Sequence, residues 1–111
     1  MNEILTKTFH FSASHSRAGK VIGKNYTLEI SIRAVPAKEE LEFERKVQSG
    51  LICSLESRDL GLHVDFLKGQ DLTEGNLLKA FWARAQEAAP FVKILSLSLT
   101  RDAKTKTTLS I

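Results

Sequence analysis

The stretch FSASHSRAGKVIGKNYTLEI, Phe11 to Ile30, organises the first half of the 111-residue chain. Apolar and polar residues alternate as the chain enters it, from Leu5 to Ala13, and again as the chain leaves it, from Asn25 to Arg33. A period of two is typical of strands with one covered face. Glycines lie between the two segments, so we predict two strands joined as a hairpin by a loop of roughly eight residues.

The pattern changes after Pro36, since proline cannot donate a backbone hydrogen bond to a sheet and so ends the second strand. A run of apolar residues four apart then predicts a helix; its members are Phe43, Val47, Leu51 and Leu55. Gly50 lies within this helix and costs about 1 kcal/mol relative to alanine. Cys53 flanks the apolar side, and we expect it to be a buried, unreactive packing residue.

A second helix follows a predicted loop from Ser57 to Gln70, with Thr73 as its expected N-cap and its end before Pro90. Its apolar side is formed by Leu77, Leu78, Phe81, Trp82, Ala85 and Ala88. Alternation returns in the last part of the chain, where the apolar side is formed by Leu95, Leu97 and Leu99. A short last strand is predicted from Thr107 to Ile111.

The order strand, strand, helix, helix, strand, strand predicts one α+β domain over residues 1–111, an antiparallel sheet with both helices on one face. The other face of the sheet carries small polar residues. It either meets water or lines a barrel formed by several subunits, because barrel closure removes exposed sheet edges. We therefore expect a homo-oligomer.

Composition narrows the classes of function. The net charge is +3, but the densest basic cluster (Arg101, Lys104 and Lys106) has no interleaved aromatic residues, so no nucleic-acid partner is expected. No apolar run reaches the ~20 residues of a membrane helix, and the first residues lack a signal-peptide pattern, which predicts a cytoplasmic protein. The single cysteine excludes an intrachain disulfide and a cysteine-rich zinc site.

Six short motifs point to a family. FSASH resembles Phe-x-Ala-Ala-His, GKNYTLEI resembles His-Gly-His-Asn-Tyr, and LEFERKV resembles Val-x-Asp-Phe. LESRDLG stands where Leu-Asp-His-x-x-Leu-Asn is expected, DLTEGNLLKAFW resembles Pro-Thr-x-Glu-Asn-Leu, and LSLTRDA resembles a strand that ends in Glu-Thr. In this order, over nearly the whole chain, the motifs resemble the 6-pyruvoyltetrahydropterin synthase family, which includes the 6-carboxytetrahydropterin synthases of queuosine biosynthesis.

The resemblance implies the tunnelling fold (T-fold) and a zinc-dependent carbon–oxygen lyase. The family binds zinc through three histidines, and a catalytic zinc site normally has three protein ligands. Only the first is present here, as His15, while the other two positions are Ile22 and Lys24. We treat His15 as a residual metal position without bound zinc, or as a structural histidine, and expect no cofactor. The position of the family's catalytic cysteine is Ala18.

The other catalytic positions of the family are also changed. Its Asp-His pair becomes Glu56 and Ser57, which removes the imidazole that exchanges protons near neutral pH. Both are vestigial catalytic positions, and Glu56 is either an acid or base without zinc or an exposed helix-end carboxylate. The glutamate of the second-helix motif becomes Gly75, and the glutamate that anchors the pterin ring becomes Asp102. Asp102 is the candidate ligand-binding residue, with a strand-end turn residue as the alternative.

Two further groups of side chains bear on a ligand. A different metal site would combine His10, His15 and His63, without any spacing that supports it. Positive charge at Arg17, Lys20 and Lys24 favours an anionic group on a ligand.

Three hypotheses on function follow. The first is a divergent synthase-like protein, a pseudoenzyme without lyase activity, that binds a pterin- or purine-like heterocycle through Asp102. The second is a working lyase of pterin or queuosine metabolism with a rearranged site. The third is a structural scaffold that keeps the fold for oligomerisation.

Overall fold

The structure is a computed structural model that describes residues 3–17, 20–58, 60, 64, 67 and 73–111. Within these residues the strands form one antiparallel sheet in the order β1-β2-β3-β4. Their bounds are β1 Ile4–Arg17, β2 Lys20–Arg33, β3 Ile94–Arg101 and β4 Thr105–Ser110. Between β2 and β3 lie α1 (Ala37–Val47), the π-helical segment η1 (Gln48–Ile52), α2 (Cys53–Leu55) and α3 (Glu74–Ala88).

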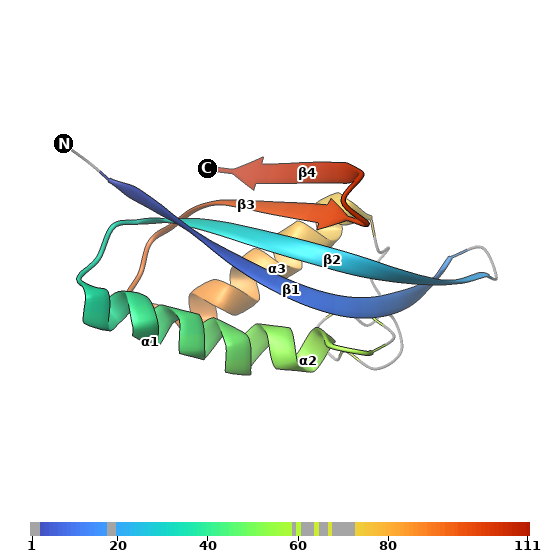
Figure 1. Cartoon of the computed structure of the whole chain (residues 1–111), viewed down its shortest axis with the longest axis horizontal. Helices are drawn as coiled ribbons and strands as arrows, with labels where there is room; N and C mark the ends of the chain where they lie inside the picture. Colours follow the sequence, from blue (N-terminus) through green and yellow to red (C-terminus); the bar gives the residue numbers. More distant parts are fainter. Residues whose placement is uncertain (1–2, 18–19, 59, 61–63, 65–66, 68–72) are drawn as a thin grey trace.

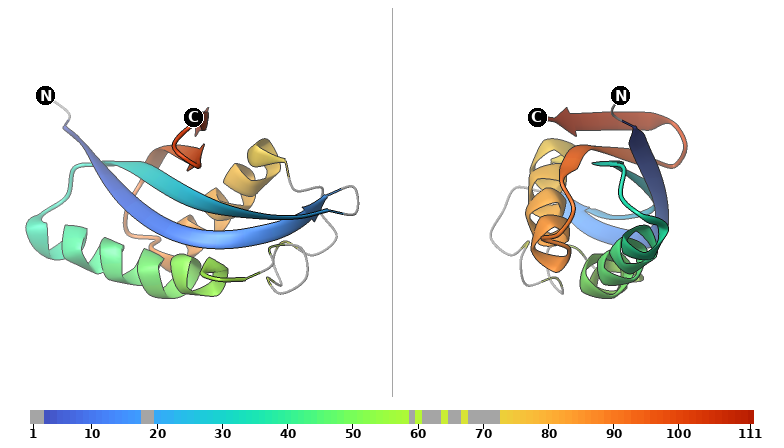
Figure 2. Two further views of the ribbon diagram at one scale, coloured as in Figure 1. Left: turned by 45° about the vertical axis from the view of Figure 1, so that its right-hand side comes forward. Right: turned by 90° about the vertical axis from the view of Figure 1, so that its left-hand side faces the viewer.

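The predicted order of elements is confirmed. The helical segments α1, η1 and α2 follow one another without a break and form the first predicted helix, and α3 is the second. Both lie on the same side of the sheet (Figure 1). Figure 2 shows the sheet curving over the two helices, so that its concave side is closed by the helical layer. Among the described residues, no helix is both long and apolar enough to cross a bilayer.

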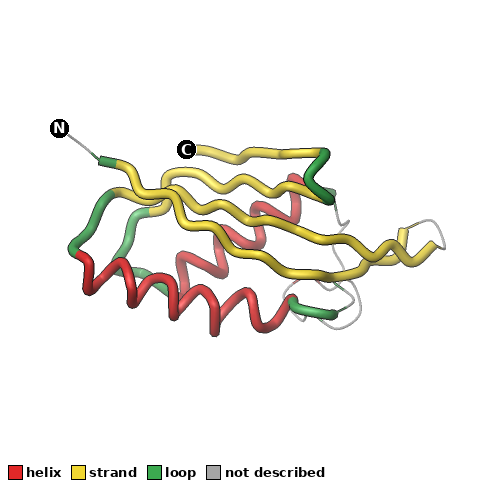
Figure 3. Tube along the Cα trace, viewed as in Figure 1, coloured by secondary structure: helices red, strands yellow, loops and turns green. Residues whose placement is uncertain are grey.

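The first hairpin is longer than its alternation predicted. Strand pairing continues to Arg17 opposite Lys20, so residues 18–19 connect the strands, and the expected loop of about eight residues is wrong. Antiparallel pairing depends on backbone groups and continues where the side chains no longer alternate. The long hairpin extends past the end of β3 and β4 in Figure 3.

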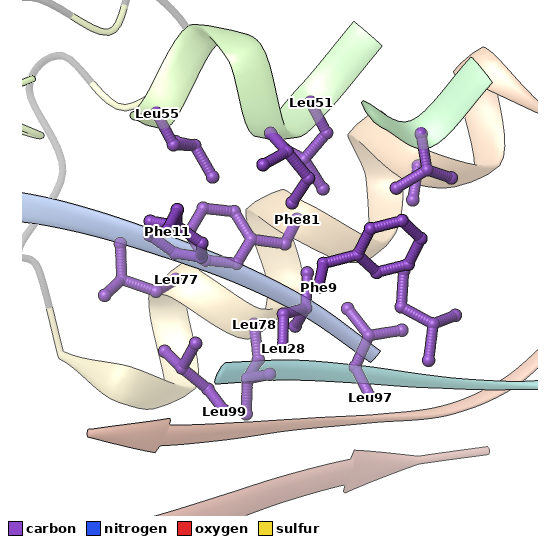
Figure 4. Close-up of a cluster of buried hydrophobic side chains, with 14 of the residues drawn as sticks. Phe9, Phe11, Leu28, Leu51, Leu55, Leu77, Leu78, Phe81, Leu97 and Leu99 are labelled. Carbon is purple, nitrogen blue, oxygen red and sulfur yellow. The ribbon is translucent and has the colours of Figure 1, made fainter. Parts of the chain in front are cut away.

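The core lies between the sheet and the helices, as the two periodicities predicted. The inner sides of β1 and β2 and the first helix meet the apolar side of α3 (Figure 4). The predicted helix stripe is fully buried, with Phe43, Val47, Leu51 and Leu55 all at 0% exposure. In α3 the side chain of Thr73 accepts the Asn76 N–H at 3.2 Å, which confirms the predicted N-cap.

One strand residue was assigned to the wrong face. Leu95 is only partly buried, while Ile94 and Leu97 are in the core. The register between β2 and β3 shifts at this point, because Ser31 pairs with Ser96 but Ile32 pairs with Ile94. Such a bulge places one additional residue in the strand and reverses the faces beyond it.

The first helix also departs from its predicted surface. Cys53 is exposed, so the expectation of a buried cysteine is wrong. Ile52 occupies the inward position beside the stripe, and the next residue turns away by about 100° around the helix axis. The stretch predicted as a loop, Ser57 to Gln70, lies largely outside the described residues, although Leu60, Val64 and Leu67 within it are buried.

Candidate functional site

A depression of about 340 Å³ lies where the first hairpin passes the turn between β3 and β4. Four parts of the chain contribute to it: β1, β2, the end of the first helix and the β3–β4 turn. Figure 1 shows these parts converging at the right of the sheet. The residues that line it are Ser12, Ala13, Ser14, Lys24, Asn25, Ser57 and Asp102. Three residues selected from the sequence, Lys24, Ser57 and Asp102, are thus brought together.

The backbone of the β3–β4 turn presents Asp102 to β2. Asp102 and Ala103 have positive φ angles of 50° and 57°, and the Lys104 N–H donates to the Arg101 carbonyl at 3.0 Å. This is a type I′ turn, whose twist suits an antiparallel hairpin. Aspartate tolerates the left-handed conformation better than most residues. Asp102 thus lies in a turn at the end of β3, and this turn directs its carboxylate toward β2.

Two contacts hold the Asp102 carboxylate, and a third holds its backbone. Its Oδ1 accepts the Asn25 N–H at 2.9 Å, its Oδ2 lies 3.0 Å from the Lys24 Nζ, and the Asp102 N–H donates to the Asn25 carbonyl at 2.8 Å. The Asn25 backbone hydrogen bond, followed by the hydrogen bond from Lys24, lowers the pKa of Asp102 below its usual value. The carboxylate is therefore ionised at neutral pH and one-third exposed.

The vestigial pair lies against the edge of β1. Ser57 has a φ of 58°, and its N–H donates to the Ser12 carbonyl at 2.6 Å. The Glu56 carboxylate accepts the Ser12 N–H, at 3.2 Å to one oxygen and 3.3 Å to the other. Beyond them, Ser14 donates to the Arg58 carbonyl and accepts from the Leu60 N–H. The chain after α2 thus covers the sheet edge beside the depression, and Glu56 is held by a backbone amide.

A ring stack and an ion pair hold the strand residues next to the β3–β4 turn. Tyr26 stacks on Phe11 with ring centroids 5.1 Å apart, and burial together with the charge of Glu74 raises the pKa of Tyr26 to about 12. Arg101, the residue before Asp102, forms an ion pair with Glu74 at 2.8 Å. The second-helix motif places the family's glutamate at Gly75, whereas the carboxylate that reaches Arg101 belongs to the preceding residue, Glu74. The motif did not indicate Glu74, because the packing of the helix decides which of two adjacent positions faces β3.

Of the three positions compared with the family's zinc ligands, only Lys24 has a side chain that the structure describes. The backbone of His15 lies opposite Ile22 in the hairpin, while the side chain of His15, together with Ala18 and His63, lies outside the described residues. Among the described residues, no group of three or more His, Cys, Asp or Glu side chains could hold a metal ion. An ammonium at Lys24 is a donor without a lone pair for a metal, so the lining of the depression does not fit zinc.

His10 is on the polar face, as predicted, where its Nδ1 lies 3.2 Å from the Thr27 hydroxyl. It does not line the depression. A metal site from His10, His15 and His63 stays a prediction, because the other two side chains lie outside the described residues.

The fold is shown by similarity to a solved structure. No family model matches the sequence, and no curated protein matches it. The structure is similar to that of Caenorhabditis elegans 6-pyruvoyl tetrahydropterin synthase, with a TM-score of 0.84 over 100% of this chain and 96% of that chain, at 18% sequence identity. The chain therefore has the fold of a 6-pyruvoyl tetrahydropterin synthase, which is the T-fold that its six motifs predicted.

Proposed function

We propose that this protein is a divergent relative of the 6-pyruvoyltetrahydropterin synthases that binds a pterin- or purine-like heterocycle and has no zinc-dependent lyase activity. The observation that carries the proposal is the ionised carboxylate of Asp102, held at a polar depression of about 340 Å³ in a chain with the synthase fold. We expect the protein to act in the cytoplasm as a homo-oligomer.

The carboxylate of Asp102 has room for a ligand. An ionised carboxylate can accept about four hydrogen bonds, and Asn25 and Lys24 use two of these sites. The remaining lone pairs suit the paired N–H groups at the edge of an amino-pyrimidinone ring. The volume of the depression is near the lower end of the usual range for small-molecule sites, about 300–1,000 Å³.

The chemistry of the side chains supports the proposed lack of lyase activity. The family's reaction uses zinc and a group that exchanges protons, whereas Lys24 is a cation and Ser57 has no group that titrates near neutral pH. Elemental mass spectrometry on protein purified without chelators is expected to give a zinc content near zero. About one zinc per chain would contradict the proposal and would favour a new ligand set.

The binding test compares two charge-neutralising variants. Titration of the purified chain with pterin, followed by calorimetry, should give a saturable isotherm, and Asp102→Asn should weaken binding by about tenfold or more, since hydrogen bonds to charged groups are the strong ones. Asparagine also tolerates the left-handed turn conformation, so the turn is retained. The control Glu87→Gln removes a carboxylate that is 74% exposed on α3 and should leave binding unchanged.

A working lyase with a rearranged site is the second candidate, because Ser57 lines the depression and Glu56 precedes it. It requires turnover of dihydroneopterin triphosphate, with or without added zinc. Product formation by the wild-type chain that is lost in Glu56→Gln would favour this candidate over a binding protein.

An oligomeric scaffold without a ligand is the third candidate. Strands β1 and β4 lie at the two edges of the sheet. The chain after α2 covers the β1 edge at Ser12 and Ser14, and unpaired strand edges are templates for pairing with another copy. This candidate predicts a defined oligomer in light scattering and no saturable binding of pterin or guanosine.

A further inference from the structure

A continuous series of hydrogen bonds crosses the end of the sheet, from Glu56 to Asp102. The Glu56 carboxylate accepts the backbone N–H of Ser12, at 3.2 Å to one oxygen and 3.3 Å to the other. The Ser12 hydroxyl donates to Oδ1 of the Asn25 side chain at 2.8 Å. The Asn25 N–H in turn donates to Oδ1 of Asp102 at 2.9 Å. The series therefore links the end of the first helix, through β1 and β2, to the carboxylate that the proposed function requires.

The register of the sheet explains why the series is continuous. Ser12 lies directly opposite Asn25 in the pairing of β1 with β2. The backbone groups of Ser12 point away from β2, because Glu56 accepts its N–H and its carbonyl accepts the Ser57 N–H. In a pair of this kind the two side chains lie close together across the strands. The backbone groups of Asn25 point to the other side, where both bond to Asp102, so Asn25 is held from both directions.

Glu56 takes part in this series from outside the depression. Ser12, Asn25 and Asp102 are among the described residues that line the depression, whereas Glu56 is not. We propose that Glu56 is a positioning residue, which holds Ser12 as a hydrogen-bond acceptor and thereby orients the Asp102 carboxylate for a ligand. In this role Glu56 supplies acceptor oxygens and transfers no proton. The inference rests on the proposed function, because it concerns binding at Asp102.

The pKa of Asp102 reports on this orientation. It is lowered first by the Asn25 backbone hydrogen bond, then by the hydrogen bond from Lys24 and by the charges of Lys24 and Arg101. Displacement of Asn25 weakens the first of these contacts, so the pKa should rise toward its usual value. Loss of the Glu56 charge by itself acts in the opposite direction, since a nearby negative charge disfavours ionisation of a carboxyl group. The sign of the change therefore separates positioning from a charge effect.

Carbon-13 NMR of the Asp102 carboxyl group during an acid titration measures this sign. Glu56→Ala removes both acceptor oxygens and should raise the pKa of Asp102 above its wild-type value. Glu56→Gln keeps one acceptor oxygen for the Ser12 N–H and should not raise it. The matched control Glu87→Ala removes a carboxylate that is 74% exposed on α3 and should leave the pKa unchanged. A pKa that falls or stays the same in Glu56→Ala would overturn the positioning role.

Pterin binding tests whether the effect passes through Ser12. In calorimetry Glu56→Ala should weaken binding by about three- to tenfold, the contribution of about one hydrogen bond, and Glu56→Gln should stay within about twofold of wild type. Ser12→Ala removes the hydroxyl and should cause a loss similar to that of Glu56→Ala. In the double variant the two losses should not add, because either substitution alone interrupts the series. Additive losses, or equal losses in Glu56→Gln and Glu56→Ala, would overturn the proposal.

The outcomes distinguish this inference from the proposed function. Pterin binding that Asp102→Asn weakens and Glu56→Ala leaves unchanged would overturn the positioning role and leave the proposed function in place. No saturable binding of pterin by the wild-type chain would overturn the proposed function and, with it, the role of Glu56 in binding. Amide NMR spectra of each variant are the control for folding, and the comparison of Ser12→Ala with Glu56→Gln decides the question even where Glu56→Ala does not fold.

Discussion

The two faces of strands β1, β2 and β3 come from the same alternation but are completed differently. The inner face is covered by the helices of the chain itself, and Leu28, Ile30 and Leu97 on it are fully buried. The outer face is polar, and its side chains pair across strands, as Thr6 does with Ser31 and Ser98 with Thr108, both at 2.9 Å.

The difference shows which part of the sheet supplies the stability of the fold. The inner face buries apolar side chains and supplies most of the folding free energy, because apolar burial is the dominant favourable contribution to folding. The outer face satisfies its own hydroxyl groups and adds little. The depression at Asp102 lies at the end of the sheet, where the Lys24–Asp102 ion pair is about one-third exposed.

The largest expected effect on stability comes from removing a core side chain that packs on the inner face. Phe81 is fully buried and packs edge-on against Phe11, with ring centroids 6.1 Å apart. Phe81→Ala should lower the free energy of unfolding by about 3–5 kcal/mol, because a cavity remains in the core. On the outer face, Ser98→Ala should change it by less than about 1 kcal/mol. Urea denaturation of both variants measures the comparison, and similar losses would contradict it.

The pKa of Tyr26 reports on burial at the end of the inner face next to the depression. Its raised pKa means that the neutral phenol is favoured in the folded state, so stability is fully present below pH 10 and is lost as the pH rises toward 12. The loss should reach about 2 kcal/mol by pH 12, since one pKa unit corresponds to ~1.4 kcal/mol.

The sequence contains a single tyrosine, so absorbance at 295 nm titrates Tyr26 alone in the wild-type chain. A midpoint near 10 in the folded protein would contradict the assignment. Tyr26→Phe is the matched control and should flatten the alkaline decline of stability in urea denaturation.

Two glycines in the helical segments differ in the space around them. A Cβ on Gly50 would lie 3.0 Å from the Cβ of Ala88 in α3, whereas nothing lies within 4 Å of a Cβ on Gly75. Gly50→Ala should destabilise the protein by about 1 kcal/mol, because the steric cost exceeds the gain in helix propensity. Gly75→Ala should stabilise it by up to about 1 kcal/mol. Thermal denaturation compares them, and equal shifts of Tm would show that the two helices do not approach closely at Gly50.

The smallest effect concerns the turn that presents Asp102. Ala103 has a φ of 57°, which is costly for alanine and free for glycine. Ala103→Gly should stabilise the protein by about 0.5–1 kcal/mol. The same substitution in the middle of α3, Ala80→Gly, should destabilise it by about 1 kcal/mol. Opposite signs in urea denaturation are the expected result, and a loss of stability in both variants would place Ala103 outside the left-handed region.

Much of the fold could be predicted because its signals are local. Alternation identified the inner faces of β1 and β2, a spacing of four identified the stripe from Phe43 to Leu55, and Thr73 marked the start of α3. Leu95 and Cys53 were assigned wrongly because a bulge and a change of inward residue depend on neighbouring elements. The length of the first hairpin was missed since backbone pairing leaves no trace in side-chain alternation.

The candidate site, like the fold, could be predicted from the sequence only in part. The sequence by itself determined the order of elements, the polarity of each face and the residue types at Asp102, Lys24 and Ser57, because these follow from periodicity and from motifs. Only the tertiary structure decided that Lys24 pairs with Asp102 and that Asn25 orients the carboxylate. Such contacts join distant parts of the chain through the register of the sheet and the left-handed turn at Asp102, and neither is encoded by the residues on one side alone.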